Sequence, residues 1–136
     1  MTSEDKELVR YRLARAEEAL KAARMTIDGG LPMSAVNRVY YACFYAVSAL
    51  LHTAGVASSK HGGVISLFER HWVKTGLIPV EMGRFYRSLF KRRQRGDYDD
   101  LVTFERPEVQ EMLAQAEEFV KTISEKAREK MTDERL

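Results

Sequence analysis

Apolar residues recur at helical spacing from the beginning of the chain. Steps of three and four residues separate Val9, Leu13, Ala16, Leu20, Ala23 and Ile27. Such spacing places these side chains along one side of a helix. The pattern predicts a helix that begins near Thr2 or Ser3 and ends at Asp28, because two glycines follow at once and Pro32 cannot prolong it.

A second helix is predicted from about Pro32 to Thr53. The proline occupies the first turn, where its missing N–H costs nothing, and Gly55 follows the last turn. One stripe of this helix consists of Val36, Tyr40, Cys43, Val47 and Leu50, and the neighbouring stripe consists of Asn37, Tyr41, Phe44, Ser48 and His52. Because the segment is apolar nearly all round, we expect it to be the central helix of the fold.

Two further helices follow. Ser58 or Ser59 can cap the third helix, which carries Val64, Leu67, Phe68 and Trp72 at helical spacing and closes at Gly76. Pro79 starts a fourth helix with an inward stripe of Met82, Phe85, Tyr86 and Leu89. The same steps of three and four residues bring Arg93 onto this inward stripe instead of the solvent-facing side.

The last third of the chain predicts a loop and one more helix. Residues 96–106 are rich in aspartate, and Pro107 starts a fifth helix with an apolar pattern from Val109 to Ala127. A charged tail from about residue 128 is expected to fray. No strand pattern or internal repeat competes with the helices. The sequence therefore predicts an all-α fold, an antiparallel up-and-down bundle of four to five helices in a single domain over residues 1–136.

Composition excludes several classes of protein. The chain has 136 residues, 45% of them hydrophobic, a formal net charge of +2 and one cysteine. Lone Cys43 excludes a disulfide scaffold and has no Cys/His spacing for zinc, which favours a reducing, cytoplasmic location. The N-terminus is too charged for a signal peptide. The longest weakly charged stretch, residues 39–57, is too short and too polar for a membrane span, so we expect no membrane association.

The fourth helix has the most unusual charge pattern of the chain. Six basic residues occupy twelve positions without an acidic residue, namely Arg84, Arg87, Lys91, Arg92, Arg93 and Arg95. Asp97, Asp99 and Asp100 follow at once. The basic residues indicate either a surface for phosphate groups or a solvated helix face. Interleaved Phe85, Tyr86 and Phe90 could stack on bases, although core packing is the simpler interpretation.

A few other residues are candidates for a binding site. Lys60 and His61 precede a helix N-terminus, where free N–H groups favour an anion, or they form an ordinary helix-start turn. Asn37, Tyr41 and Tyr45 could line a groove beside Arg93, or pack with their polar groups satisfied. Asp97 is expected to orient Arg93 rather than to bind metal, because the clustered aspartates lack calcium-loop spacing. We expect no metal and no cofactor.

Three separated motifs resemble the HEPN domain, whose name stands for higher eukaryotes and prokaryotes nucleotide-binding. They are Ala35-Val36-Asn37-Arg38-Val39-Tyr40-Tyr41-Ala42-Cys43-Phe44-Tyr45, Lys60-His61-Gly62-Gly63-Val64-Ile65 and Arg93-Gln94-Arg95-Gly96-Asp97-Tyr98. The resemblance spans residues 5 to 125 and is closest to small stand-alone prokaryotic HEPN proteins. It implies a helical bundle that forms a homodimer with paired motifs facing one cleft. It also implies a toxin-like role beside a minimal nucleotidyltransferase, and in many members metal-independent ribonuclease activity.

The chain departs from the family's ribonuclease motif at one position. That motif is an arginine, four to six residues and a histidine, whereas Tyr98 stands where the histidine is expected after Arg93. Histidine suits proton transfer because its ordinary pKa of about 6.5 is near working pH, while a tyrosine near 10 is a poor base. We therefore expect a HEPN protein that contacts RNA or nucleotides through Arg93, Asp97, Tyr98 and the basic helix. A non-catalytic module that supports a nucleotidyltransferase and a structural adaptor are the alternatives.

Overall fold

Five α-helices and one π-helical turn make up the part of the chain that the computed structural model describes, residues 1–98 and 101–132. In order they are α1 (Ser3–Asp28), α2 (Pro32–Thr53), α3 (His61–Phe68), the π-helical turn η1 (Glu69–Val73), α4 (Val80–Tyr98) and α5 (Arg106–Thr132). No strand occurs among these residues. The prediction of an all-helical bundle is confirmed.

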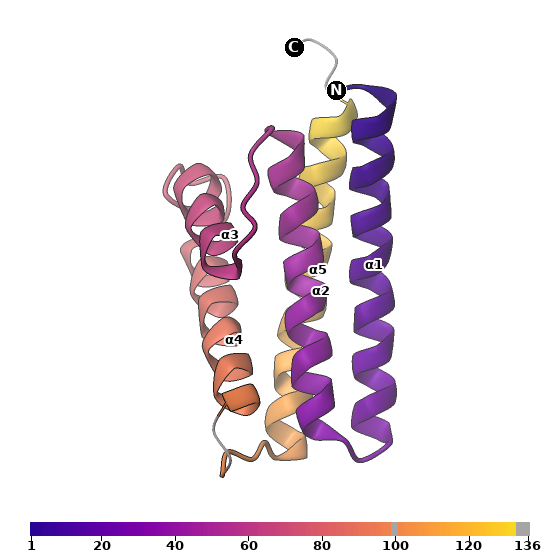
Figure 1. The fold of residues 1–136 in the computed structure, drawn as a ribbon, viewed down its shortest axis with the longest axis vertical. Coiled ribbons are helices and arrows are strands. Elements are labelled where there is room, and N and C mark those ends of the chain that lie inside the picture. The colour runs from indigo at the N-terminus through magenta and orange to yellow at the C-terminus, as the bar shows by residue number, and fades with distance from the viewer. Residues whose placement is uncertain (99–100, 133–136) are drawn as a thin grey trace.

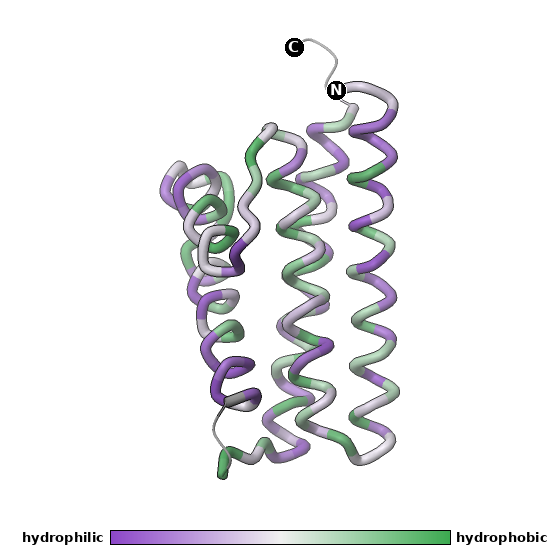
Figure 2. The backbone as a smooth tube through the Cα atoms, viewed as in Figure 1, coloured by the Kyte–Doolittle hydropathy of each residue, from purple (hydrophilic) through white to green (hydrophobic). Residues whose placement is uncertain are grey.

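The helices are arranged around α2, as the sequence predicted. Figure 1 shows α1, α2 and α5 as three long helices side by side, with α3, η1 and α4 on the other side of α2. Helices α1 and α2 run in opposite directions, as do α4 and α5, and the start of α1 and the end of α5 lie at the same end of the bundle (Figure 1). Apolar residues in Figure 2 are frequent along α2, whose buried face meets helices on both sides.

Local signals fix the beginning and the end of α1. Thr2 accepts a hydrogen bond from the backbone N–H of Asp5 at 3.0 Å, and Asp5 accepts one from the backbone N–H of Thr2, also at 3.0 Å. This reciprocal capping box satisfies N–H groups that the first turn leaves free. At the other end Gly30 has φ +76°, a conformation that favours glycine, and Pro32 starts α2 two residues later. The predicted bounds of both helices are confirmed.

The later elements differ from the predicted bounds in three places. The third helix widens into a π-helical turn at Glu69, yet Phe68 and Trp72 are both buried, so its apolar stripe is preserved. Helix α4 continues to Tyr98, three residues into the predicted loop, and an ion pair between Arg93 and Asp97 supports this extra turn. Helix α5 continues to Thr132, where Met131 is buried.

Helix α4 approaches η1 closely through a glycine on its buried side. A Cβ atom at Gly83 would lie 3.1 Å and 3.2 Å from the two methyl groups of Val73. This spacing is tighter than ordinary van der Waals contact, so a larger residue would push α4 away from η1. The glycine therefore allows α4 to pack closely against η1.

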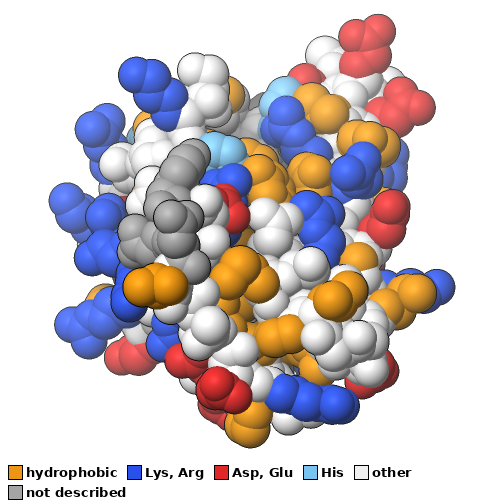
Figure 3. Space-filling view, turned by 60° about the horizontal axis from the view of Figure 1, so that its bottom comes forward, with side chains coloured by type: hydrophobic (Ala, Val, Ile, Leu, Met, Phe, Trp, Pro, Cys, Tyr) orange, Lys and Arg blue, Asp and Glu red, His pale blue; other side chains and the backbone are white. Residues whose placement is uncertain are grey.

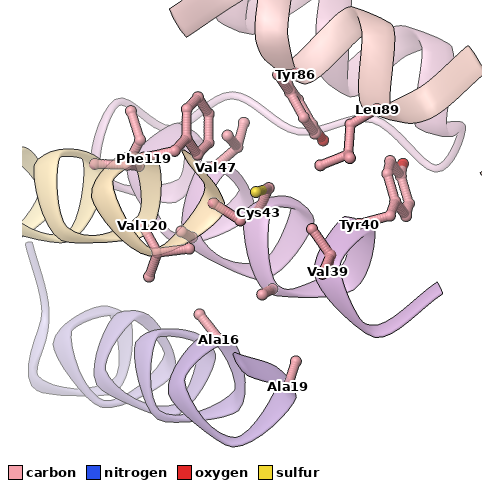
Figure 4. Packing of buried hydrophobic residues seen from close by; sticks show 14 of the residues in the cluster. Ala16, Ala19, Val39, Tyr40, Cys43, Val47, Tyr86, Leu89, Phe119 and Val120 are labelled. Carbon is pink, nitrogen blue, oxygen red and sulfur yellow. The ribbon is translucent and has the colours of Figure 1, made fainter. Parts of the chain in front are cut away.

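The core is continuous across both sides of α2. Figure 4 shows Cys43 and Val47 of α2 on the side that faces Phe119 of α5 and Tyr86 of α4, with Ala16 and Ala19 of α1 on the opposite side of α2. Cys43 is fully buried, and this burial raises the pKa of its thiol well above the usual range. The thiol therefore acts as a small apolar group in the core.

An aromatic cluster joins α5 to α3 and α4. The ring of Phe119 lies 6.0 Å from that of Phe68, 5.8 Å from that of Phe85 and 5.7 Å from that of Tyr86, measured between ring centres. Phe119, Phe68 and Tyr86 are almost completely buried. Core packing, the simpler interpretation of Tyr86 and Phe85, is thus confirmed. No helix among residues 1–98 and 101–132 is long and apolar enough to cross a membrane.

We expect Phe119→Ala to lower the free energy of unfolding by about 3–5 kcal/mol, because it removes a buried ring and leaves a cavity between three helices. Phe119→Leu keeps most of the volume and should cost clearly less. Chemical denaturation followed by circular dichroism measures both. Equal and small losses for the two variants would contradict the bridging role of this ring.

Candidate functional site

Arg93 lies on the inward side of α4 and is held among tyrosines of α2. Its guanidinium carbon is 5.1 Å from the ring centre of Tyr40 and 5.2 Å from that of Tyr41, and Nη2 donates a hydrogen bond of 3.3 Å to the Tyr41 hydroxyl. Nε lies 3.2 Å from Oδ2 of Asp97 in an ion pair, but the geometry does not make a hydrogen bond there. These contacts fix the cation in place. The side chain is 19% exposed, so the cation also reaches the surface.

Next to Arg93, a histidine of α3 completes the hydrogen bonding of a buried tyrosine. The Tyr40 hydroxyl and Nδ1 of His61 are 2.6 Å apart, and the imidazole stacks on Phe44 with 4.6 Å between ring centres. Tyr40 is fully buried, and burial is the main cause that raises its pKa to about 12. The pKa of His61 is lowered, first by burial and then by the positive charge of Arg93. The imidazole is therefore neutral at pH 7.

This arrangement supports two kinds of chemistry. A fixed guanidinium can bind a phosphate group through paired hydrogen bonds, and it favours negative charge that develops on it. No described residue hydrogen-bonds Nε2 of His61, so this nitrogen can donate or accept a proton. The sequence named His61 and Arg93 as separate candidates. The structure brings them together through Tyr40, which the sequence places on the apolar stripe of the second helix.

The basic residues of α4 divide into two groups. Arg87 donates hydrogen bonds of 2.9 Å and 2.6 Å to the two carboxylate oxygens of Glu69, so it ties α4 to η1. The hydrogen bond lowers the pKa of the Glu69 carboxyl. The other group, Arg84, Lys91, Arg92 and Arg95, has no carboxylate partner among the described residues. Lys60 is exposed at the start of α3. Figure 3 shows Lys and Arg side chains gathered along one edge of the molecule.

The predicted groove residues take different positions. Tyr41 contacts Arg93 directly, whereas Asn37 accepts hydrogen bonds from Arg38 through Oδ1, the shorter being 2.7 Å. Tyr45 accepts a hydrogen bond of 3.2 Å from Arg15 of α1. The structure therefore adds Arg15 and Arg38 to this face. Arg38 precedes Tyr41 by three residues, a helical spacing that could have indicated it, but no sequence signal links Arg15 to Tyr45.

The remaining predicted residues follow Arg93 at the end of α4. Tyr98 ends α4, and Asp99 and Asp100 lie outside the described residues. Within residues 1–98 and 101–132, no group of three His, Cys, Asp or Glu side chains is placed to hold a metal ion.

Comparison with known proteins gives consistent matches over most of the chain. The model of the HEPN domain matches residues 9–127. A UPF0332 protein of Thermotoga maritima is 43% identical over 121 residues, which cover 89% of this chain and 92% of the relative. Two proteins of Methanocaldococcus jannaschii are named as candidate toxins. One is 35% identical, covering 84% of each chain, and the other is 31% identical, covering 79% of this chain and 74% of the relative.

We expect His61 to titrate below the ordinary histidine value of about 6.5 in an NMR pH titration. Replacing Arg93 by Met removes the positive charge but leaves the burial, so the pKa of His61 should rise part of the way toward that value. The ring signals of His52 and His71, which do not contact Arg93, serve as internal controls. An unchanged His61 titration in the variant would contradict the proximity of the two groups.

Proposed function

Because this chain belongs to the HEPN domain family, we propose that it binds RNA or nucleotides through Arg93 as the toxin-like component of a two-protein pair with a minimal nucleotidyltransferase. The observation that carries the proposal is the fixed guanidinium of Arg93 between Tyr40 and Tyr41, beside a neutral His61. The candidate-toxin names of two relatives support the toxin-like role. We place the pair in the cytoplasm, in keeping with the single reduced cysteine.

The tyrosine faces give Arg93 its position without cancelling its charge. A guanidinium over an aromatic ring is attracted by the negative face of the ring, and Asp97 balances it from one side only. A phosphate that approaches from solvent therefore meets a cation that has already lost its freedom of movement. Lys91, Arg92 and Arg95 extend the positive surface toward the end of α4 and contribute sequence-independent attraction for a phosphate backbone.

The second part of the proposal is a homodimer whose two copies of the Arg93 site share one cleft. A two-fold axis would place the same surface of each copy against the other. Family resemblance implies this assembly, and the position of α4 at one side of the bundle leaves its basic end accessible to a partner (Figure 1). Two sites facing one cleft would double the positive charge that an RNA strand meets.

A second candidate function is a non-catalytic module that binds nucleotides and supports the nucleotidyltransferase. Tyr98 favours it, because a tyrosine at the place of the motif histidine is a poor general base. The two functions share the Arg93 site and differ in turnover. Incubation of labelled RNA with the protein in metal-free buffer separates them, since the non-catalytic module leaves bound RNA intact.

Replacement of Arg93 by Ala should weaken binding of a single-stranded RNA by about 1–3 kcal/mol, the cost of a lost hydrogen bond to a charged group. Fluorescence anisotropy measures the affinity over a range of salt concentrations. Arg24→Ala is the matched control, because this substitution removes the same charge at a distant place. Arg24 lies on α1 and forms an ion pair with Glu117 of α5. Equal affinities of the two variants would contradict the site.

Two further measurements complete this test. Replacing Lys91, Arg92 and Arg95 together by Gln should flatten the salt dependence of the affinity, because fewer counterions are released from the RNA. Circular dichroism of Arg93→Ala should show unchanged helix content. Cooperative loss of helix at room temperature would instead identify Arg93 as a structural member of a buried ion pair.

Light scattering at micromolar concentration should give a mass twice the 15.6 kDa of the chain, as the homodimer requires. The mass should be measured at several protein concentrations, because a dimer dissociates on dilution. A constant monomer mass up to the highest concentration would refute the shared cleft, while leaving binding at a single Arg93 site open to the RNA measurements above.

A further inference from the structure

A pocket of about 250 Å³ lies between α1, α2 and the segment that links α2 to α3. Aromatic rings of Tyr11, Phe44 and Tyr45 form part of its wall, and Leu51 and Val56 add aliphatic surface. The pocket is smaller than the roughly 300–1,000 Å³ of sites for drug-sized ligands. Its size and its aromatic wall suit one flat ring system.

The pocket adjoins the Arg93 site through the aromatic residues of α2. Phe44 lines the pocket, and its other contacts include the imidazole of His61, which stacks on it at 4.6 Å. The ring of Tyr45, also in the pocket wall, lies 6.0 Å from that of Tyr41, which contacts Arg93. An unbroken row of rings therefore leads from the pocket to Arg93.

The arginines at the rim are held by hydrogen bonds to neutral groups. Arg12 lines the pocket and donates a hydrogen bond of 3.2 Å to the backbone oxygen of Ser48. Arg15 donates to the hydroxyls of Tyr11 and Tyr45, each at 3.2 Å, and lies 5.1 Å above the Tyr45 ring. All three partners are neutral. No described carboxylate oxygen lies within 4.0 Å of either guanidinium, and Glu18 interacts with Arg15 only at longer range. The rim is thus fixed in geometry and open to an anion.

Arg38 continues this surface toward the Arg93 site. Its guanidinium carbon lies 5.2 Å from the ring centre of Tyr41, the same distance as that of Arg93. Arg15 and Arg38 border a common small hollow, which Tyr45 and Glu18 also line. Figure 3 shows hydrophobic and basic side chains interleaved in the middle of the molecular face, in addition to the basic edge.

We propose that this pocket binds the base of a nucleoside 5′-phosphate, with Phe44 and Tyr45 against the base and Arg12 and Arg15 near the phosphate. Flat aromatic side chains stack on bases of any sequence, and guanidinium groups match the geometry of phosphate oxygens. The inference rests on the proposed function and specifies its ligand. The nucleotide is either free or part of a single-stranded RNA that continues along Arg38 to Arg93.

Adenosine 5′-monophosphate and ribose 5-phosphate are the probes, because they differ only in the base. The base should strengthen binding by about tenfold or more, as base stacking on aromatic side chains does elsewhere. Ala57→Phe, at an exposed position in the pocket wall, should remove this difference by filling the pocket. Ala54→Phe, exposed on the same link but outside the pocket wall, is the matched control and should bind like the wild type.

Each result decides between the pocket and the Arg93 site. Equal affinities for the two probes, or wild-type binding by Ala57→Phe, would overturn the pocket. A single-stranded RNA tested in parallel distinguishes failure of the pocket from failure of the proposed function. RNA binding that depends on Arg93 but not on Ala57→Phe, together with equal affinities for the two probes, overturns the pocket alone. Nucleotide binding that Ala57→Phe abolishes, without any RNA binding, supports the pocket and overturns RNA as the ligand.

Discussion

The hydroxyl of Tyr40 is the group on which the core and the site both depend. Tyr40 is completely buried in the centre of α2, and a buried hydroxyl without a partner would cost about 1–3 kcal/mol. His61 supplies the partner from the first turn of α3, while the face of the same ring lies against Arg93 of α4. One residue of α2 thus fixes the start of α3 and the position of the cation on α4. A change that moved Tyr40 would disturb the packing and the site together.

The sequence predicts those features that depend on neighbours along the helix. Gly30, Pro32 and the apolar periodicity mark the ends of α1 and α2, and the same periodicity places Arg93 on the inward side of α4. Contacts across the bundle could not be predicted in this way. Tyr40 and His61 are separated by a link of irregular backbone, whose path determines whether their side chains meet.

The same limit applies to the arginines. Six closely spaced basic residues indicate a positive surface on α4. Arg87, however, is hydrogen-bonded to Glu69 of η1, a partner that no local sequence pattern indicates. The sequence did not indicate Arg15 as a residue of a binding surface. The hydroxyl and the ring face of Tyr45 hold its guanidinium in place. Charge density along a sequence counts cations but does not show which of them a carboxylate already neutralises. That information requires the tertiary arrangement.

The way each arginine is held bears on what the surface can bind. An arginine paired with a carboxylate, such as Arg24 or Arg87, contributes little net field, because a nearby negative charge cancels most of it. An arginine held by neutral hydroxyls and ring faces keeps its full charge and also loses its freedom before the ligand arrives. Arg15 is held by two hydroxyls and a ring face, with Glu18 at longer range, and Arg38 is held by the Asn37 amide oxygen and a ring face. Arg93 combines ring faces with one carboxylate. Because ordering a side chain on binding costs free energy, these preordered cations can hold a phosphate more strongly than the exposed lysine and arginines at the end of α4. The tyrosines of α2 therefore act twice, as packing for the core and as supports for the cations on the surface.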